Sequence, residues 1–118
     1  GVEMQLDNGG QELTVTLRPL PKFTQLLQNY PNPFNPETWI PYQLSESASV
    51  VVSIYDSQGI LVRRLELGDQ PAGHYQMRDR AAYWDGRNAE GETVASGLYL
   101  YQIEAGNYQQ IRKMVSLK

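Results

Sequence analysis

Hydrophobic and polar positions alternate along several short stretches of the chain, a pattern typical of half-buried β-strands. Residues 12–17 and 98–103 alternate at period two, and in the second stretch Tyr99, Tyr101 and Ile103 fall on one face. Residues 50–55 are nearly all apolar, which favours a central strand. We expect a closing strand at residues 110–117. No stretch repeats at 3.6 residues, so the pattern predicts an all-β protein.

Turn-forming and strand-breaking residues separate these stretches. Pro41 interrupts the extended residues 38–44, which predicts an edge strand or a bulged one. The apolar positions of residues 60–67 change parity, which predicts a bulge near Arg63 and Arg64. The remaining expectations are a turn at residues 7–10, at most one helical turn at 26–28, a turn at 56–59, a loop at 68–73, short extended pieces at 74–78 and 82–84, a polar loop at 85–92 and a turn at 105–108.

The number and spacing of these stretches indicate an immunoglobulin- or fibronectin-III-like β-sandwich of about seven or eight strands. The chain has 118 residues, which suits one domain, and it contains no cysteine. Residues 26–118 form the predicted sandwich. Residues 1–25 are interpreted as a linker or as a strand contributed from or to a preceding domain. Pro19 and Pro21 interrupt ladder bonding, so residues 18–25 are expected to be a linker.

Three prolines in six residues make residues 30–36 unusual. Each proline pushes the residue before it into an extended conformation, so this segment is expected to be stiff and neither helical nor part of a central strand. Tyr30 and Phe34 are available to pin the segment onto the sandwich.

An ordered set of motifs resembles the type A C-terminal sorting domain of the type IX (Por) secretion system. That family is similar in turn to the immunoglobulin-like domain of flagellar hook-capping proteins. The motifs are residues 30–36 with Thr38, residues 52–56 with Gly59, residues 71–73, residues 84–88, Gly91, residues 94–99 and residues 112–114. Leu98 stands where valine is commoner in the family, and the hydrophobic pairing before Lys118 matches only loosely.

The resemblance implies a non-catalytic module that directs an exported protein of a Gram-negative bacterium through the periplasm to the cell surface or medium. Its partners would be outer-membrane secretion proteins and a fused upstream cargo domain, with cleavage in residues 18–25 in some cases and a leader upstream of Gly1. It implies no cofactor. The corresponding recognition residues are Tyr30, Pro31, Asn32, Pro33, Phe34, Asn35, Pro36, Gly97, Tyr99, Arg112, Lys113, Met114, Val115, Leu117 and Lys118.

Residues 111–118 carry three cations and no acidic side chain. If this segment is a strand at a sheet edge, its backbone can pair with a strand of an acidic receptor. In the alternative interpretation, Val115 and Leu117 are ordinary packing residues and the cations protect the edge from aggregation.

Other candidate sites are weaker. His74 has no nucleophile motif beside it, which favours a surface histidine. Asp85, Asn88 and Glu90, with Glu92 nearby, are weak candidates for a calcium site, although their spacing is that of a turn whose side chains bind backbone amides.

Other classes of partner are less favoured by the sequence. Trp39, Trp84 and the tyrosines are compatible with a sugar-stacking platform, although core packing is favoured. Arg63 and Arg64 are compatible with phosphate binding, but a solvated bulge is favoured. The net charge of −3 does not favour nucleic acid, and no apolar run is long enough to cross a bilayer. A sorting and anchoring module is therefore the leading hypothesis for the function. The alternative is a structural spacer or a subunit of a surface assembly that exchanges strands, and a second alternative is a carbohydrate- or calcium-binding module.

Overall fold

The computed structural model describes the backbone of residues 2–8 and 11–118, and side chains from residue 18 onward. The described chain is built of strands joined by turns, as the alternation predicted. The strands are β1 (Val2–Asn8), β2 (Gln11–Leu17), β3 (Gln25–Leu26), β4 (Thr38–Ile40), β5 (Tyr42–Leu44), β6 (Ala48–Asp56), β7 (Leu61–Gln70), β8 (Gly73–Tyr75), β9 (Ala82–Trp84), β10 (Gly97–Ala105) and β11 (Tyr108–Ser116).

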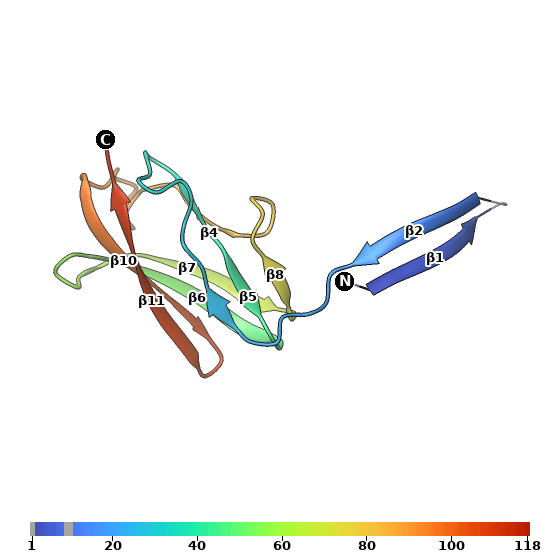
Figure 1. The fold of residues 1–118 in the computed structure, drawn as a ribbon. Coiled ribbons are helices and arrows are strands. Elements are labelled where there is room, and N and C mark those ends of the chain that lie inside the picture. The colour runs from blue at the N-terminus through green and yellow to red at the C-terminus, as the bar shows by residue number, and fades with distance from the viewer. Residues whose placement is uncertain (1, 9–10) are drawn as a thin grey trace.

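Two layers face each other across the core (Figure 1). One layer is an antiparallel sheet in the order β11-β10-β6-β7. The other consists of β3-β5-β8 and β4-β9, also antiparallel. Pro41 separates β4 from β5, and its carbonyl accepts a hydrogen bond from the N–H of Leu27 at 3.0 Å. The architecture is the predicted β-sandwich, and β1 and β2 form a separate hairpin that extends away from it (Figure 1).

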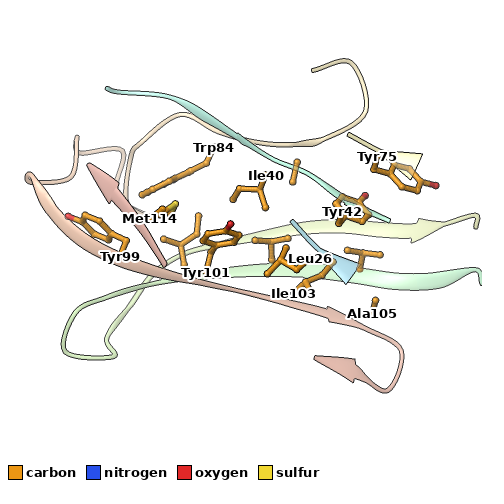
Figure 2. Packing of buried hydrophobic residues seen from close by; sticks show 14 of the residues in the cluster. Leu26, Ile40, Tyr42, Tyr75, Trp84, Tyr99, Tyr101, Ile103, Ala105 and Met114 are labelled. Atoms are coloured by element: carbon orange, nitrogen blue, oxygen red, sulfur yellow. The ribbon is translucent and has the colours of Figure 1, made fainter. Parts of the chain in front are cut away.

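Apolar side chains that alternate along the strands of both layers form the core. Val50, Val52 and Ile54 of β6 are fully buried, as are Tyr101 and Ile103 of β10. The opposite layer contributes Leu26, Ile40, Tyr42, Leu44 and Trp84, and Figure 2 shows several of these side chains converging. Each fully buried large apolar side chain contributes roughly 1.5–3 kcal/mol relative to exposure, so this packing stabilises the sandwich without a disulfide.

The β6–β7 ladder contains two irregularities, and one of them is the bulge expected near Arg63 and Arg64. Val50 pairs with Gly68 and Val51 with Glu66, which leaves Leu67 as an extra residue, and a second shift between Ile54 and Tyr55 leaves Val62 as an extra residue. The bulge at Val62 adjoins Arg63 and confirms the expectation, whereas the one at Leu67 was not anticipated. Val62 and Leu67 pack against the core, so each bulge turns an apolar side chain inward.

Other expectations fail where pairing with a distant strand decides the local conformation. Residues 26–28 make no helical turn, because Leu26 pairs with Tyr42 and is buried. The loop expected at 68–73 is strand as far as Gln70, which pairs with Ala48. Of residues 74–78, only His74 and Tyr75 are strand.

At the N-terminal end, β1 was not anticipated. It includes Asp7 and Asn8 of the expected turn, while residues 9 and 10 lie outside the described residues. The boundary between residues 25 and 26 remains a prediction, and β3 begins at Gln25. Within residues 2–8 and 11–118, no helix is long and apolar enough to cross a membrane.

Candidate functional site

The Asn-Pro segment, residues 30–36, lies along the outer edge of β11. The N–H of Phe34 donates to the carbonyl of Val115 at 2.9 Å, and the carbonyl of Phe34 accepts from the N–H of Leu117 at 3.0 Å. The N–H of Val115 donates to Oδ1 of Asn32 at 2.9 Å. The structure therefore brings together the two segments that the sequence indicated separately, as a short parallel pairing.

Two aromatic side chains anchor the Asn-Pro segment. Phe34 is buried, with its ring centroid 5.3 Å from that of Trp84 and 6.5 Å from that of Tyr99. Tyr30 stacks on Trp39 with centroids 6.3 Å apart, and its hydroxyl donates to the carbonyl of Gln76 at 2.5 Å. The expected pinning role of Tyr30 and Phe34 is what the geometry shows. The peptide bonds preceding Pro31, Pro33 and Pro36 are cis.

A cluster of buried polar groups forms hydrogen bonds with the start of the Asn-Pro segment and the residues just before it. The N–H of Asn29 donates to the Tyr101 hydroxyl at 2.9 Å, and that hydroxyl donates to the carbonyl of Leu27 at 2.8 Å. The Asn29 side chain donates to Oγ1 of Thr38 at 3.0 Å, which in turn donates to the carbonyl of Pro31 at 3.1 Å. Burial raises the pKa of Tyr101 to about 12, so its hydroxyl stays protonated at neutral pH.

Asn29 and the hydroxyl of Tyr101 belong to this site, although the residue pattern alone did not indicate them. The only available signal was a polar residue at each end of the proline-rich stretch, Asn29 before it and Thr38 after it. Both side chains are buried, and their hydrogen bonds compensate the desolvation of the loop backbone.

The predicted recognition residues divide into buried and exposed groups. Phe34, Tyr99 and Met114 are buried, and Tyr30 and Arg112 are partly buried, with Nε of Arg112 donating to the carbonyl of Leu26 at 2.8 Å. Gly97 opens β10 opposite Ser116. The exposed residues are Pro31, Asn32, Pro33, Asn35, Pro36, Lys113, Val115, Leu117 and Lys118. A partner could therefore touch prolines, amides and lysines here, but not the buried ring of Phe34.

β11 lies at the edge of its sheet, as expected, but much of this edge is already bonded. Phe34 and Asn32 pair with Val115 and Leu117, and the Gln28 side chain donates to the carbonyl of Lys113 at 2.9 Å. Every second residue of an edge strand directs its peptide groups away from the sheet. The peptide groups of Gln109 and Ile111 therefore lie on the same outer edge of β11 as those of Lys113 and Val115. The expectation of a free edge near the end of β11 is therefore wrong at Val115 and Leu117, because the Asn-Pro segment occupies it.

The loop at residues 85–92 uses its oxygen atoms to hold its own backbone. Oδ1 of Asp85 accepts from the N–H of Arg87 at 3.0 Å and from the Arg63 guanidinium at 3.2 Å. Oδ1 of Asn88 accepts from the N–H groups of Glu90 and Glu92 at 3.1 and 2.9 Å. These are the bonds of the turn interpretation. Among the described residues, no group of three acidic or histidine side chains is arranged to hold a metal ion.

Half of the aromatic candidates for a sugar platform are buried inside the protein. Trp84 is fully buried, as is Tyr101, and Tyr99 is nearly so. Tyr83 is exposed and Trp39 is partly buried, and the Arg78 guanidinium sits 4.2 Å from the centre of the Trp39 ring. His74 is partly buried, and its Nε2 lies 2.9 Å from the carbonyl oxygen of Pro19.

Residues 35–109 match the FlgD Ig-like domain family. The chain belongs to this family. It is 38% identical over 58 residues to the basal-body rod modification protein FlgD of Salmonella typhimurium and to that of Salmonella typhi. Each match covers 49% of this chain and only 23% of the FlgD protein, so the similarity concerns a domain and not the whole relative.

Solved structures extend the relation to the fold. The latent dimeric PorU of Porphyromonas gingivalis is similar with a TM-score of 0.62 and 21% identity, over 91% of this chain and 10% of PorU. PorZ of the same bacterium is similar with a TM-score of 0.53 and 23% identity, over 77% of this chain and 11% of PorZ. The FlgD Ig-like fold of this chain therefore occurs as a small part of much larger proteins.

Proposed function

We propose that this FlgD Ig-like domain is a non-catalytic sorting and anchoring module that directs an attached protein to the bacterial surface or medium. The observation that carries the proposal is the pairing of Phe34 with Val115 and Leu117. It makes one continuous surface from the Asn-Pro segment and the basic end of β11.

The position of this surface relative to the family match supports a specialised role. The match covers residues 35–109, whereas Asn32, Phe34, Val115 and Leu117 all lie outside it. The shared fold thus holds in place two flanking segments, and recognition by a partner rests on those segments.

The chemistry of the surface suits a protein partner with an acidic strand or loop. Lys113 and Lys118 are exposed, and Asn32, Pro33 and Asn35 lie on the adjoining segment. Rigid prolines lose little conformational entropy on binding, and lysines steer an acidic partner toward the surface. PorZ is a surface component of the type-IX secretion system. We propose such a system as the setting for this module, with outer-membrane secretion proteins as the partners.

A secretion assay with charge-reversal variants tests the proposal. Residues 18–118 are fused to a periplasmic reporter in a bacterium with a type-IX secretion system. The double substitution of Lys113→Glu and Lys118→Glu should reduce secretion by at least about tenfold, because it reverses the charge that steers the partner. Arg64→Glu changes an exposed cation on β7, far from the surface along the sheet, and should leave secretion unchanged.

Melting curves of each fusion check that the sandwich remains folded. The side chains of Arg64, Lys113 and Lys118 are all exposed, so every variant should melt at the same temperature as the parent. Secretion that is unchanged by the double substitution, or reduced equally by Arg64→Glu, would contradict the proposal.

A further inference from the structure

Residues 18–20 form a strap that lies against β8 and the turn after it. The Arg18 guanidinium donates to Oε1 of Gln76 at 3.3 Å. Nε2 of His74 lies 2.9 Å from the carbonyl oxygen of Pro19. These contacts give the strap a defined position on the sandwich, and in that position it forms one wall of a cleft.

The cleft has a volume of about 370 Å³ and lies between the strap and residues 72–80. This volume is in the range of clefts that hold a small ligand or a few residues of a peptide. Neither the Asn-Pro segment nor the end of β11 contributes to its lining. The cleft is therefore separate from the surface proposed for sorting.

Two guanidinium groups line the cleft without a carboxylate partner. Arg18 and Arg80 are both exposed. The Arg80 guanidinium lies 4.5 Å from the centre of the Tyr75 ring, and this cation–π contact holds it in place. Asp79 is the one described acidic residue in the lining, and it forms no ion pair with Arg18 or Arg80. The cleft therefore has a net positive charge and N–H donors available to an anionic group.

Exposed apolar side chains flank these guanidinium groups. Leu20 is 63% exposed and Met77 is 73% exposed, the largest fraction for a large apolar side chain within residues 18–118. Met77 begins the turn that carries Arg80, because its carbonyl accepts from the N–H groups of Arg80 and Ala81 at 2.9 and 2.8 Å. One exposed apolar side chain is ordinary, but two of them beside two unpaired arginines are typical of a surface that binds another molecule.

A histidine nitrogen without a partner indicates what else the ligand would carry. His74 lines the cleft, and its Nδ1 is buried and makes no hydrogen bond. Nε2 must carry the hydrogen, because the Pro19 carbonyl can only accept, and Nδ1 of the neutral ring then needs a donor. A peptide offers backbone N–H donors together with a side-chain carboxylate for the arginines, whereas an inorganic anion such as sulfate offers only acceptors.

We propose that this cleft is a second docking site, which takes a segment of a partner protein that carries an acidic residue next to an apolar one. The carboxylate pairs with Arg18 or Arg80, and the apolar side chain covers Leu20 and Met77. Positive charge and exposed apolar surface thus favour the same kind of segment. The site is independent of the sorting proposal, because it shares no lining residue with that surface.

Titration of the isotope-labelled full chain with short peptides, followed by amide chemical shifts, tests the proposal. The probe is an acetylated and amidated peptide that contains the sequence Glu-Leu-Glu. It should shift the amide signals of residues 72–80 with a dissociation constant of about 1 mM or less. Control peptides with Gln-Leu-Gln, which removes the charge, and Glu-Gly-Glu, which removes the apolar side chain, should bind at least about fivefold more weakly.

Matched substitutions in the full chain assign the binding to the cleft. Arg80→Gln should weaken binding of the Glu-Leu-Glu peptide by at least about fivefold, whereas Lys22→Gln, an exposed cation that does not line the cleft, should not. Met77→Gln should also weaken binding, and Leu61→Gln, an exposed apolar residue of β7, is its control. All four side chains are exposed, so the variants should keep the amide spectrum of a folded chain.

Several outcomes would overturn the inference. Two of them are the absence of shifts in residues 72–80 at several millimolar peptide and equal binding of the Gln-Leu-Gln control. A third is an equal effect of Arg80→Gln and Lys22→Gln. Sodium sulfate that produces the same shifts at the same concentration would show a general anion site instead. Binding to vesicles that contain phosphatidylglycerol, without binding to the peptide, would show a lipid site instead.

Discussion

Gly86 lies so close to Pro36 that a Cβ added to Gly86 would overlap the carbonyl oxygen of Pro36. Gly86 also has a φ of +77°, a conformation that side chains rarely adopt. This contact joins the 85–92 loop to the end of the Asn-Pro segment, and so it helps to fix the surface that we propose for recognition.

Gly86→Ala should therefore destabilise the protein by about 3–4 kcal/mol, because strain at positive φ and a backbone clash act together. Gly59→Ala is a matched control, since Gly59 has a φ of +82° but open space around its Cα. It should cost only about 1–2 kcal/mol. Urea denaturation of both variants measures the difference, and equal losses would show that the Pro36 contact yields without cost.

Phe34→Ala should cost about 3–5 kcal/mol, because it leaves a cavity beside Trp84 and Tyr99. The chain has one other phenylalanine, Phe23, which is 59% exposed. Phe23→Ala should cost less than about 1 kcal/mol by the same measurement. Amide hydrogen exchange at Leu117 should also accelerate in Phe34→Ala beyond the change at Ile103, since Leu117 donates to the Phe34 carbonyl. If Leu117 stays as protected as in the parent, the Asn-Pro segment does not depend on its aromatic anchor.

Tyr101→Phe removes the hydroxyl that bonds both Asn29 and Leu27. One buried and one partly buried backbone group then lose their partner, and the expected loss of stability at neutral pH is roughly 1–3 kcal/mol. Tyr83→Phe is the control, because its hydroxyl bonds Glu37 at the surface, and it should change stability by less than about 0.5 kcal/mol. Similar losses in the two variants would contradict a special role for the buried cluster.

Stability should fall as the pH rises from about 10 toward 12. Burial raises the pKa of Tyr101 to about 12, from an ordinary value of 10.0, and burial also raises the pKa of Tyr42. In this interval the unfolded chain releases protons that the folded chain retains, so alkali favours unfolding, and below pH 10 the contribution is fully present. Melting temperature against pH measures the effect. Tyr101→Phe should flatten the decline, and an unchanged slope would contradict the assignment to Tyr101.

Asn88→Ala should destabilise the protein by about 1 kcal/mol, because two N–H groups of the 85–92 loop lose their acceptor. Addition of calcium or of a chelator should leave the melting temperature of the parent chain unchanged, since the Asp85 and Asn88 oxygens already bind this loop and Arg63. A clear rise with calcium would instead restore the metal interpretation of Asp85, Asn88 and Glu90.

Local pattern was sufficient for the long strands. β6 and β10 follow the apolar alternation of residues 50–55 and 98–103, because burial of one face requires side chains of period two. The parity change in residues 60–67 correctly indicated an irregular ladder. It located the bulge at Val62, beside Arg63, but not the one at Leu67, because a bulge is defined by the partner strand as much as by its own.

The surface formed by the Asn-Pro segment and the end of β11 could be predicted only in part from the sequence. The stiffness of residues 30–36 and the basic character of residues 111–118 can be read from residue types alone. The contact between these two segments cannot be read in this way. Phe34 and Leu117 are 83 positions apart, and the residue type of one does not indicate that it pairs with the other. The same holds for β3, whose two residues are strand only because β5 lies beside them.

The sequence by itself determined that this protein is all-β, where its long strands run, and that a rigid proline-rich segment and a basic strand exist in it. The alternation of apolar and polar residues, the geometry of proline and the local charge depend only on residues close together in the sequence. They can therefore be read without knowledge of the folded structure. Only the tertiary structure decided that these two segments meet, that the edge of β11 is partly closed, and that the polar loop bonds to itself. Those outcomes depend on pairings between distant residues, which form only when the two layers close over their common core.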